Sequence, residues 1–134
     1  MTTPCIITVH NIAFQGRFEA GLFAHLGLAP EAFGIDGVEY YGGVGFLKAG
    51  MQLADAITTV SPTYAKEILD PEFGMGLEGL IGARRDRVSG IVNGIDTAIW
   101  NPATDSALPG PFSASTIKAR KANKRAVEAA FGLT

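Results

Sequence analysis

Apolar and β-branched residues form three short runs along the chain, each bounded by polar or glycine-containing segments. Val, Ile and Thr favour extended backbone, and a short continuous apolar run is typical of a strand that is buried on both faces. These runs therefore predict three buried β-strands. They cover residues 5–10, 56–60 and 88–92.

Between and after these runs, apolar residues recur every three or four positions, which is the spacing of one helix face. Ser61 followed by Pro62 is typical of a helix start, because the hydroxyl can cap the first turn and proline suits its first position. The predicted helices cover residues 18–26, 46–55, 61–70, 77–85 and 113–131. Strands that alternate with helices predict an α/β fold, a Rossmann-like parallel sheet with flanking helices. Three strands are few for such a sheet, so the chain is expected to form part of a domain.

Glycine and proline mark the irregular segments. Five glycines fall within residues 34–45, where they predict a loop or weak hairpin, because glycine adopts backbone conformations that other residues avoid. Residues 102–111 contain three prolines and a glycine, which makes this segment the best candidate for a linker.

Composition narrows the class of protein. The chain has 134 residues, 47% of them hydrophobic and 18% charged, which excludes a disordered tail. The net charge of −2 provides no basic field for nucleic acid or an anionic membrane, and no apolar run reaches the 18 residues of a transmembrane helix. A single cysteine, Cys5, and the lack of a secretory leader favour the cytoplasm. Cys5 is expected to be inert within its apolar strand.

Two glycine-rich motifs raise the possibility of phosphate binding. Residues 74–79 (GMGLEG) match the dinucleotide-binding pattern G-x-G-x-x-G, but that pattern requires a preceding strand and here a predicted helix precedes it. Residues 42–45 (GGVG) with Lys48 lack the Lys-Ser/Thr pair of a P-loop. The favoured interpretation of residues 74–79 is a turn that opens the next helix, and that of residues 42–45 is a flexible loop near a ligand.

Polar residues follow two of the predicted strands. His10 ends the first, and Asn93 and Asp96 follow the third. Ligands of open parallel sheets bind at the carboxyl ends of the strands, so all three are candidate binding residues. The alternatives are a packed or surface histidine and ordinary turn chemistry. No set of residues has the spacing of a metal site, and the basic residues of the last helix lack the interleaved aromatic residues of a nucleic-acid surface.

Taken together, several strings resemble bacterial glycogen synthases and plant starch synthases. The order and spacing of the motifs are more specific than any one of them, and the resemblance covers nearly the whole chain. The strings are TVHNIAFQG (8–16), FLKAG (46–50), TTVSPTYA (58–65), GLEGL (76–80), GIVNGID (90–96) and WNPATD (100–105).

The resemblance implies a retaining glucosyltransferase of the GT-B fold, which moves glucose from ADP-glucose to the non-reducing end of an α-1,4-glucan. It implies no metal and no cofactor, ADP-glucose being a substrate. By the family pattern His10 lies at the donor sugar and acts as the catalytic residue, while Asn93 faces the same cleft. Asn11 is a neighbouring substrate-binding residue.

The family's Lys-x-Gly-Gly loop and its whole second domain have no counterpart in this sequence. The resemblance therefore implies an incomplete half of a GT-B N-terminal domain in residues 1–101. Residues 102–134 would be a linker and the helix that leads to an absent C-terminal domain. The chain is expected to be inactive by itself. Two other classes stay open: a non-catalytic carbohydrate- or partner-binding module, and a small nucleotide-binding oxidoreductase.

Overall fold

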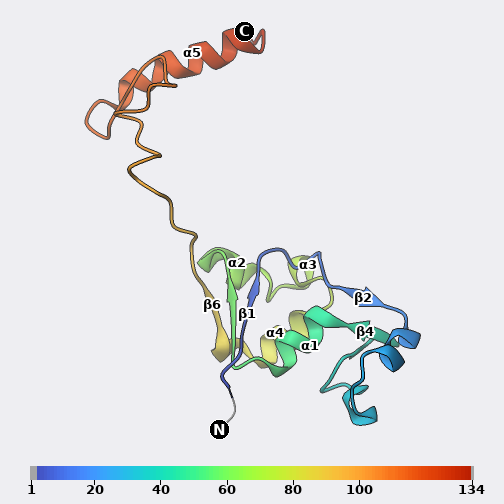
Figure 1. Cartoon of the computed structure of the whole chain (residues 1–134). Helices are drawn as coiled ribbons and strands as arrows, with labels where there is room; N and C mark the ends of the chain where they lie inside the picture. The colour runs from blue at the N-terminus through green and yellow to red at the C-terminus, as the bar shows by residue number, and fades with distance from the viewer. Residues whose placement is uncertain (1–2, 134) are drawn as a thin grey trace. The chain divides into compact units, whose positions relative to one another are not determined.

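The computed structural model describes residues 3–133. The chain divides into two compact units, Met1–Asn93 and Gly94–Thr134 (Figure 1). The first unit contains two small sheets and four α-helices among its described residues. Its elements are β1 (Ile6–Val9), β2 (Arg17–Phe18), η1 (Ala20–His25), η2 (Pro30–Ala32), β3 (Glu39–Tyr40), β4 (Gly43–Gly45), α1 (Phe46–Leu53), β5 (Ala56–Thr59), α2 (Pro62–Glu67), α3 (Pro71–Gly74), α4 (Glu78–Ala83), η3 (Arg85–Arg87) and β6 (Val88–Gly90). The second unit contains η4 (Ile117–Ala119) and α5 (Arg120–Ala130).

The three predicted strands form one parallel sheet in the order β1-β5-β6. The prediction that all three are buried is wrong for β1 and β6, which are the edge strands of this sheet and are largely exposed. The central strand β5 is the most buried of the three, which fits its apolar sequence. Cys5 corrects one expectation. It is exposed and precedes β1, and its backbone N–H donates to the Asp55 carboxylate at 2.8 Å.

The core beside this sheet takes side chains from α1, from α4 and from the residues that flank α2 and α4. Helix α2 packs on β5 and β6, and α1 packs on α4. Burying each large apolar side chain contributes roughly 1.5–3 kcal/mol, so this cluster is the main source of stability in the unit. Its fully buried members are Val9, Met51, Ile57, Ile68, Leu77 and Ile81.

The second sheet is antiparallel, in the order β2-β4-β3. Strands β3 and β4 form the hairpin expected within residues 34–45. The helix predicted over residues 18–26 is wrong in part, because Phe18 pairs with Val44 in β2 and only Ala20–His25 coil, as a 3₁₀ helix. The helical spacing still has a packing role, since Phe23 and Leu26 contact a small core around Val44.

The predicted start of α2 is confirmed. The Ser61 hydroxyl accepts hydrogen bonds from the backbone N–H groups of Thr63 and Tyr64, at 3.2 and 3.3 Å. The sequence did not predict α3, which Asp70 caps by accepting from the Glu72 N–H at 3.1 Å. The glycine motif at residues 74–79 ends α3 and opens α4. The element directly before it is helix α3 and not a strand, which confirms the turn interpretation.

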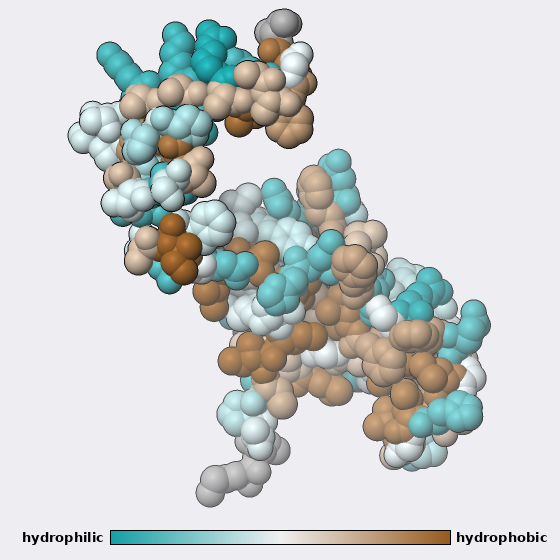
Figure 2. Space-filling model, turned by 45° about the horizontal axis from the view of Figure 1, so that its top comes forward, coloured by the Kyte–Doolittle hydropathy of each residue, from teal (hydrophilic) through white to brown (hydrophobic). Residues whose placement is uncertain are grey.

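In the second unit the helix predicted over residues 113–131 begins later, at Arg120. The preceding residues form tighter three-residue turns, in which the Thr116 N–H donates to the Ser113 carbonyl at 3.1 Å and the Ala119 N–H to the Thr116 carbonyl at 2.9 Å. Glu128 pairs with Lys124 and Arg125 on α5. Polar side chains line one side of this helix and apolar ones the other, as Figure 2 shows.

Candidate functional site

The carboxyl ends of the three parallel strands form the edge where ligands of such sheets bind. Val9 pairs with Thr59 and Thr59 with Gly90, so the strands end side by side. Neighbouring strands lie about 4.8 Å apart, which puts β1 and β6 about 10 Å from each other. Residues that directly follow β1 and β6 therefore leave the sheet at the same edge, within reach of one small ligand.

His10 is the first residue beyond β1, and it is exposed. The chain after it turns at once, because Asn11 Oδ1 accepts from the Ala13 N–H at 2.9 Å. The next residue, Ile12, is buried, and its N–H donates to the Tyr64 hydroxyl on α2 at 2.9 Å. These bonds fix the turn against α2 and leave the His10 imidazole and the Asn11 side chain at the surface.

Asn93 lies three residues beyond the end of β6 and is also exposed. The Ile91 N–H donates to the Thr59 carbonyl at 2.8 Å, so the ladder guides the chain one residue past the strand. Asn93 thus follows β6 beyond the same edge of the sheet at which β1 ends before His10. No hydrogen bond joins Asn93 to His10 or Asn11 within residues 3–133.

Asp96 behaves as the turn residue that the alternative interpretation described. Its carboxylate accepts from the Ala98 and Ile99 N–H groups at 2.9 and 3.1 Å. It belongs to the second unit, Gly94–Thr134.

The strand ends at this edge pack closely against the start of α2. The Thr59 side chain is buried, and its hydroxyl donates to the Ser61 carbonyl at 2.9 Å. Gly90 faces the same carbonyl, and a Cβ at Gly90 would lie 2.2 Å from it. Only glycine allows β6 to approach the start of α2 this closely, so the end of β6 packs directly against the start of α2.

Lys48 does not form the phosphate cradle considered from the sequence. Its ammonium group is buried and donates to the carbonyls of Ile35 and Gly37, the latter at 2.9 Å. Burial lowers the pKa of Lys48, and the charges of Glu39 and Asp36 oppose that shift. The lysine is occupied in holding the loop before β3, and residues 43–45 of the glycine run are strand β4.

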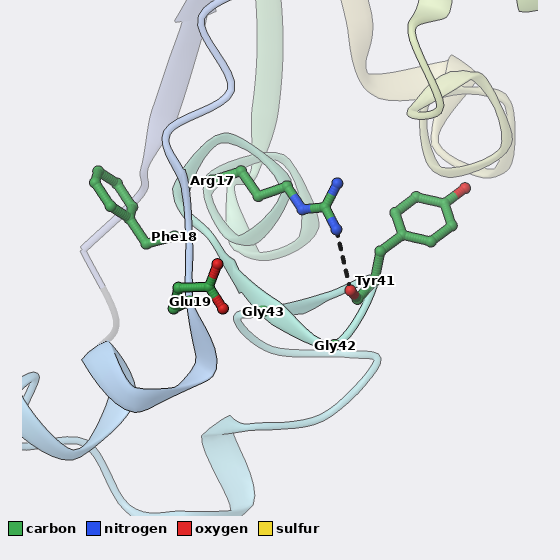
Figure 3. Close-up of a pocket in the computed structure, with 6 residues that line it drawn as sticks. All are labelled: Arg17, Phe18, Glu19, Tyr41, Gly42 and Gly43. Atoms are coloured by element: carbon green, nitrogen blue, oxygen red, sulfur yellow. Dashed lines mark hydrogen bonds between the residues drawn. The ribbon is translucent and has the colours of Figure 1, made fainter.

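A depression of about 410 Å³ at the antiparallel sheet was missed by reasoning from the sequence (Figure 3). The Arg17 guanidinium donates to the Tyr41 carbonyl at 3.1 Å, and its central carbon lies 5.7 Å from the centre of the Tyr41 ring. The available signal was Tyr41-Gly42 within a glycine-rich hairpin, where a tyrosine is unusual. The depression is lined by Arg17, Phe18, Glu19, Tyr41, Gly42 and Gly43.

Neither a metal centre nor a membrane span emerges from the described part of the chain. Residues 3–133 contain no group of three or more His, Cys, Asp or Glu side chains placed to hold a metal ion. None of the described helices has the length and apolar character needed to cross a bilayer.

The parallel sheet with flanking helices has the fold of part of a GT-B glycosyltransferase catalytic domain, as the match to a solved structure shows. Its structure resembles the catalytic domain of starch synthase IV from Arabidopsis thaliana, solved bound to ADP and acarbose. The TM-score is 0.74 at 34% sequence identity, and the match covers 96% of this chain and 27% of that one.

The chain belongs to the family described as "Starch synthase catalytic domain", whose sequence model matches residues 1–83. It is similar to the glycogen synthase of Mesorhizobium japonicum, 65% identical over 131 residues, and to that of Novosphingobium aromaticivorans, 63% identical over 130 residues. These matches cover 98% and 97% of this chain. The chain spans about a quarter of the length of both relatives, 27% in each case.

Proposed function

We propose that this chain supplies one wall of a site where glucose is transferred from ADP-glucose to the non-reducing end of an α-1,4-glucan, with retention of configuration. The observation that carries the proposal is the shared carboxyl edge of β1 and β6, from which His10 and Asn93 both emerge exposed. Membership of the starch synthase family supplies the reaction.

The expected roles follow from the chemistry of glucosyl transfer. The reaction passes through a state in which the sugar carries positive charge while the diphosphate leaves with negative charge. An imidazole and a carboxamide give directional hydrogen bonds to sugar hydroxyls, so His10 and Asn93 orient the donor sugar at the reacting centre. The Asn11 oxygen already accepts from the Ala13 N–H, so the Asn11 amide NH₂ is the group left for substrate.

The other participants also follow from this proposal. ADP-glucose is a substrate, and neither a metal nor a cofactor takes part. Because this chain spans a quarter of its relatives' length, we expect the cations that neutralise the diphosphate, and the C-terminal GT-B domain, to correspond to the part of the relatives outside the match. We place the reaction in the cytoplasm.

A chimera tests this function. Residues 1–134 replace the matched segment of the Mesorhizobium japonicum enzyme, and transfer of labelled glucose from ADP-glucose to glycogen is measured. His10→Ala is expected to lower kcat/KM by about 30-fold, which corresponds to roughly 2 kcal/mol of lost hydrogen bonding. His25→Ala is the matched control, because His25 is an exposed histidine on η1, away from the sheet edge.

Two results would contradict the proposal. One is a chimera whose turnover is unchanged by His10→Ala. The other is an equal loss in the His25→Ala control, which would point to a general loss of folding. The 134-residue chain alone is expected to incorporate no glucose in the same assay.

A further inference from the structure

Tyr41 occupies a backbone position that disfavours tyrosine. Tyr41 and Gly42 form the two-residue turn between β3 and β4, and both have positive φ, 48° and 77°. Such hairpin turns favour Asn-Gly or Gly-Gly, because a bulky side chain at positive φ is strained. Asparagine adopts this backbone conformation with less strain than tyrosine. Backbone strain that is kept at one residue points to a functional role for its side chain.

The Tyr41 ring is held in place while much of it faces solvent. The residue is 69% exposed, and its ring contacts Tyr40 edge-on, with 4.7 Å between the ring centres. Arg17 lies over it and donates to its carbonyl. Gly76 also faces the ring, since a Cβ there would lie 3.7 Å from it. A fixed, exposed aromatic ring is a preformed platform for a flat, partly apolar ligand.

The depression beside the ring combines this platform with two opposite charges. In Figure 3 the Arg17 and Tyr41 side chains lie on one side, the Glu19 carboxylate faces the hollow, and the backbone of Gly42 and Gly43 lies below. A phosphate entering this hollow would meet the Glu19 charge. A neutral ligand rich in hydroxyl groups, by contrast, can donate to the carboxylate and accept from the guanidinium.

The hollow surface continues toward the candidate sugar site. A second depression, of about 480 Å³, is lined by Met75 and by residues 13–18 of the chain after His10. It shares Arg17 and Phe18 with the first depression. A chain-like ligand with its end at the carboxyl edge can therefore follow the surface from the loop after His10 to the hairpin turn.

We infer that Tyr41, Arg17 and Glu19 form a subsite that binds an internal glucose unit of an α-glucan. The apolar face of the sugar ring packs on Tyr41, while its hydroxyl groups bind the guanidinium and the carboxylate. The choice of an α-glucan as ligand rests on the proposed function. The site itself rests on the strained tyrosine and the hollow beside it.

The test is a titration of the ¹⁵N-labelled 134-residue chain with maltoheptaose, following the backbone amide signals of Gly42 and Gly43. The main variant is Tyr41→Asn, which suits the turn and is expected to raise the urea midpoint of unfolding while weakening glucan binding by about fivefold or more. Tyr41→Phe keeps the ring and is expected to leave the Kd within about twofold. Phe131→Ala removes a similarly exposed aromatic ring from the second unit and is also expected to leave the Kd unchanged.

The subsite is overturned if these amide signals do not move at about 20 mM maltoheptaose, if they respond to ADP instead, or if Tyr41→Asn leaves the Kd unchanged. Failure of the proposed function is a separate outcome. It would appear as a chimera insensitive to His10→Ala, while the Tyr41→Asn titration still showed weaker glucan binding.

Discussion

At the scale of single residues, Arg84 shows how a charged side chain closes the end of a helix. Its guanidinium donates to the carbonyls of Gln52 and Ala54, which lie at the C-terminal end of α1. The last carbonyls of a helix have no partner within the helix, and a cation at this end also favours the helix dipole. Arg84 thereby ties α4 to the turn that leads into β5.

Replacing Arg84 by methionine is expected to lower the free energy of unfolding by about 1.5–3 kcal/mol. The reason is that two partly buried carbonyls lose hydrogen bonds to a charged donor. Arg85→Met is the matched control, because Arg85 is an exposed neighbour and its loss is expected to cost less than about 0.5 kcal/mol. Urea denaturation measures both, and equal effects of the two substitutions would contradict the role given to Arg84.

At the scale of secondary structure, the sequence predicted the elements that carry their own local signals. The strands at 56–60 and 88–92 and the Ser61 cap follow from side-chain chemistry alone. The strand β2 could not be predicted in this way, because Arg17 and Phe18 are extended only through pairing with β4, more than twenty residues later. The depression beside Tyr41 depends on the same pairing between distant residues, and no periodic pattern of hydrophobic residues in the sequence predicts it.

Gly90 offers a direct test of how β6 meets α2. Gly90→Ala is expected to destabilise the protein by about 3 kcal/mol or more, because the new Cβ would lie 2.2 Å from the Ser61 carbonyl oxygen, a backbone atom. Gly94→Ala is the control, since nothing lies within 4 Å of a Cβ there. Urea melts of the two variants should differ clearly. If both proteins unfolded at the same midpoint, the close approach of β6 and α2 would be wrong.

At the scale of the whole molecule, the rule that ligands bind at the carboxyl ends of parallel strands made His10, Asn93 and Asp96 candidates, and the family resemblance selected His10 and Asn93 among them. The structure brings the strands that precede them into one sheet, with matching ends. Their roles toward a sugar stay a prediction. Asp96 also follows a parallel strand in the sequence, yet it belongs to the other unit and its carboxylate caps a turn.

The most direct measurement of the central claim is a crystal structure of the chimera with ADP and acarbose bound. The account predicts a sugar ring at the carboxyl edge of the parallel sheet, with hydroxyl groups about 2.7–3.2 Å from both the His10 imidazole and the Asn93 side chain. A sugar bound with both side chains out of hydrogen-bonding reach would contradict it.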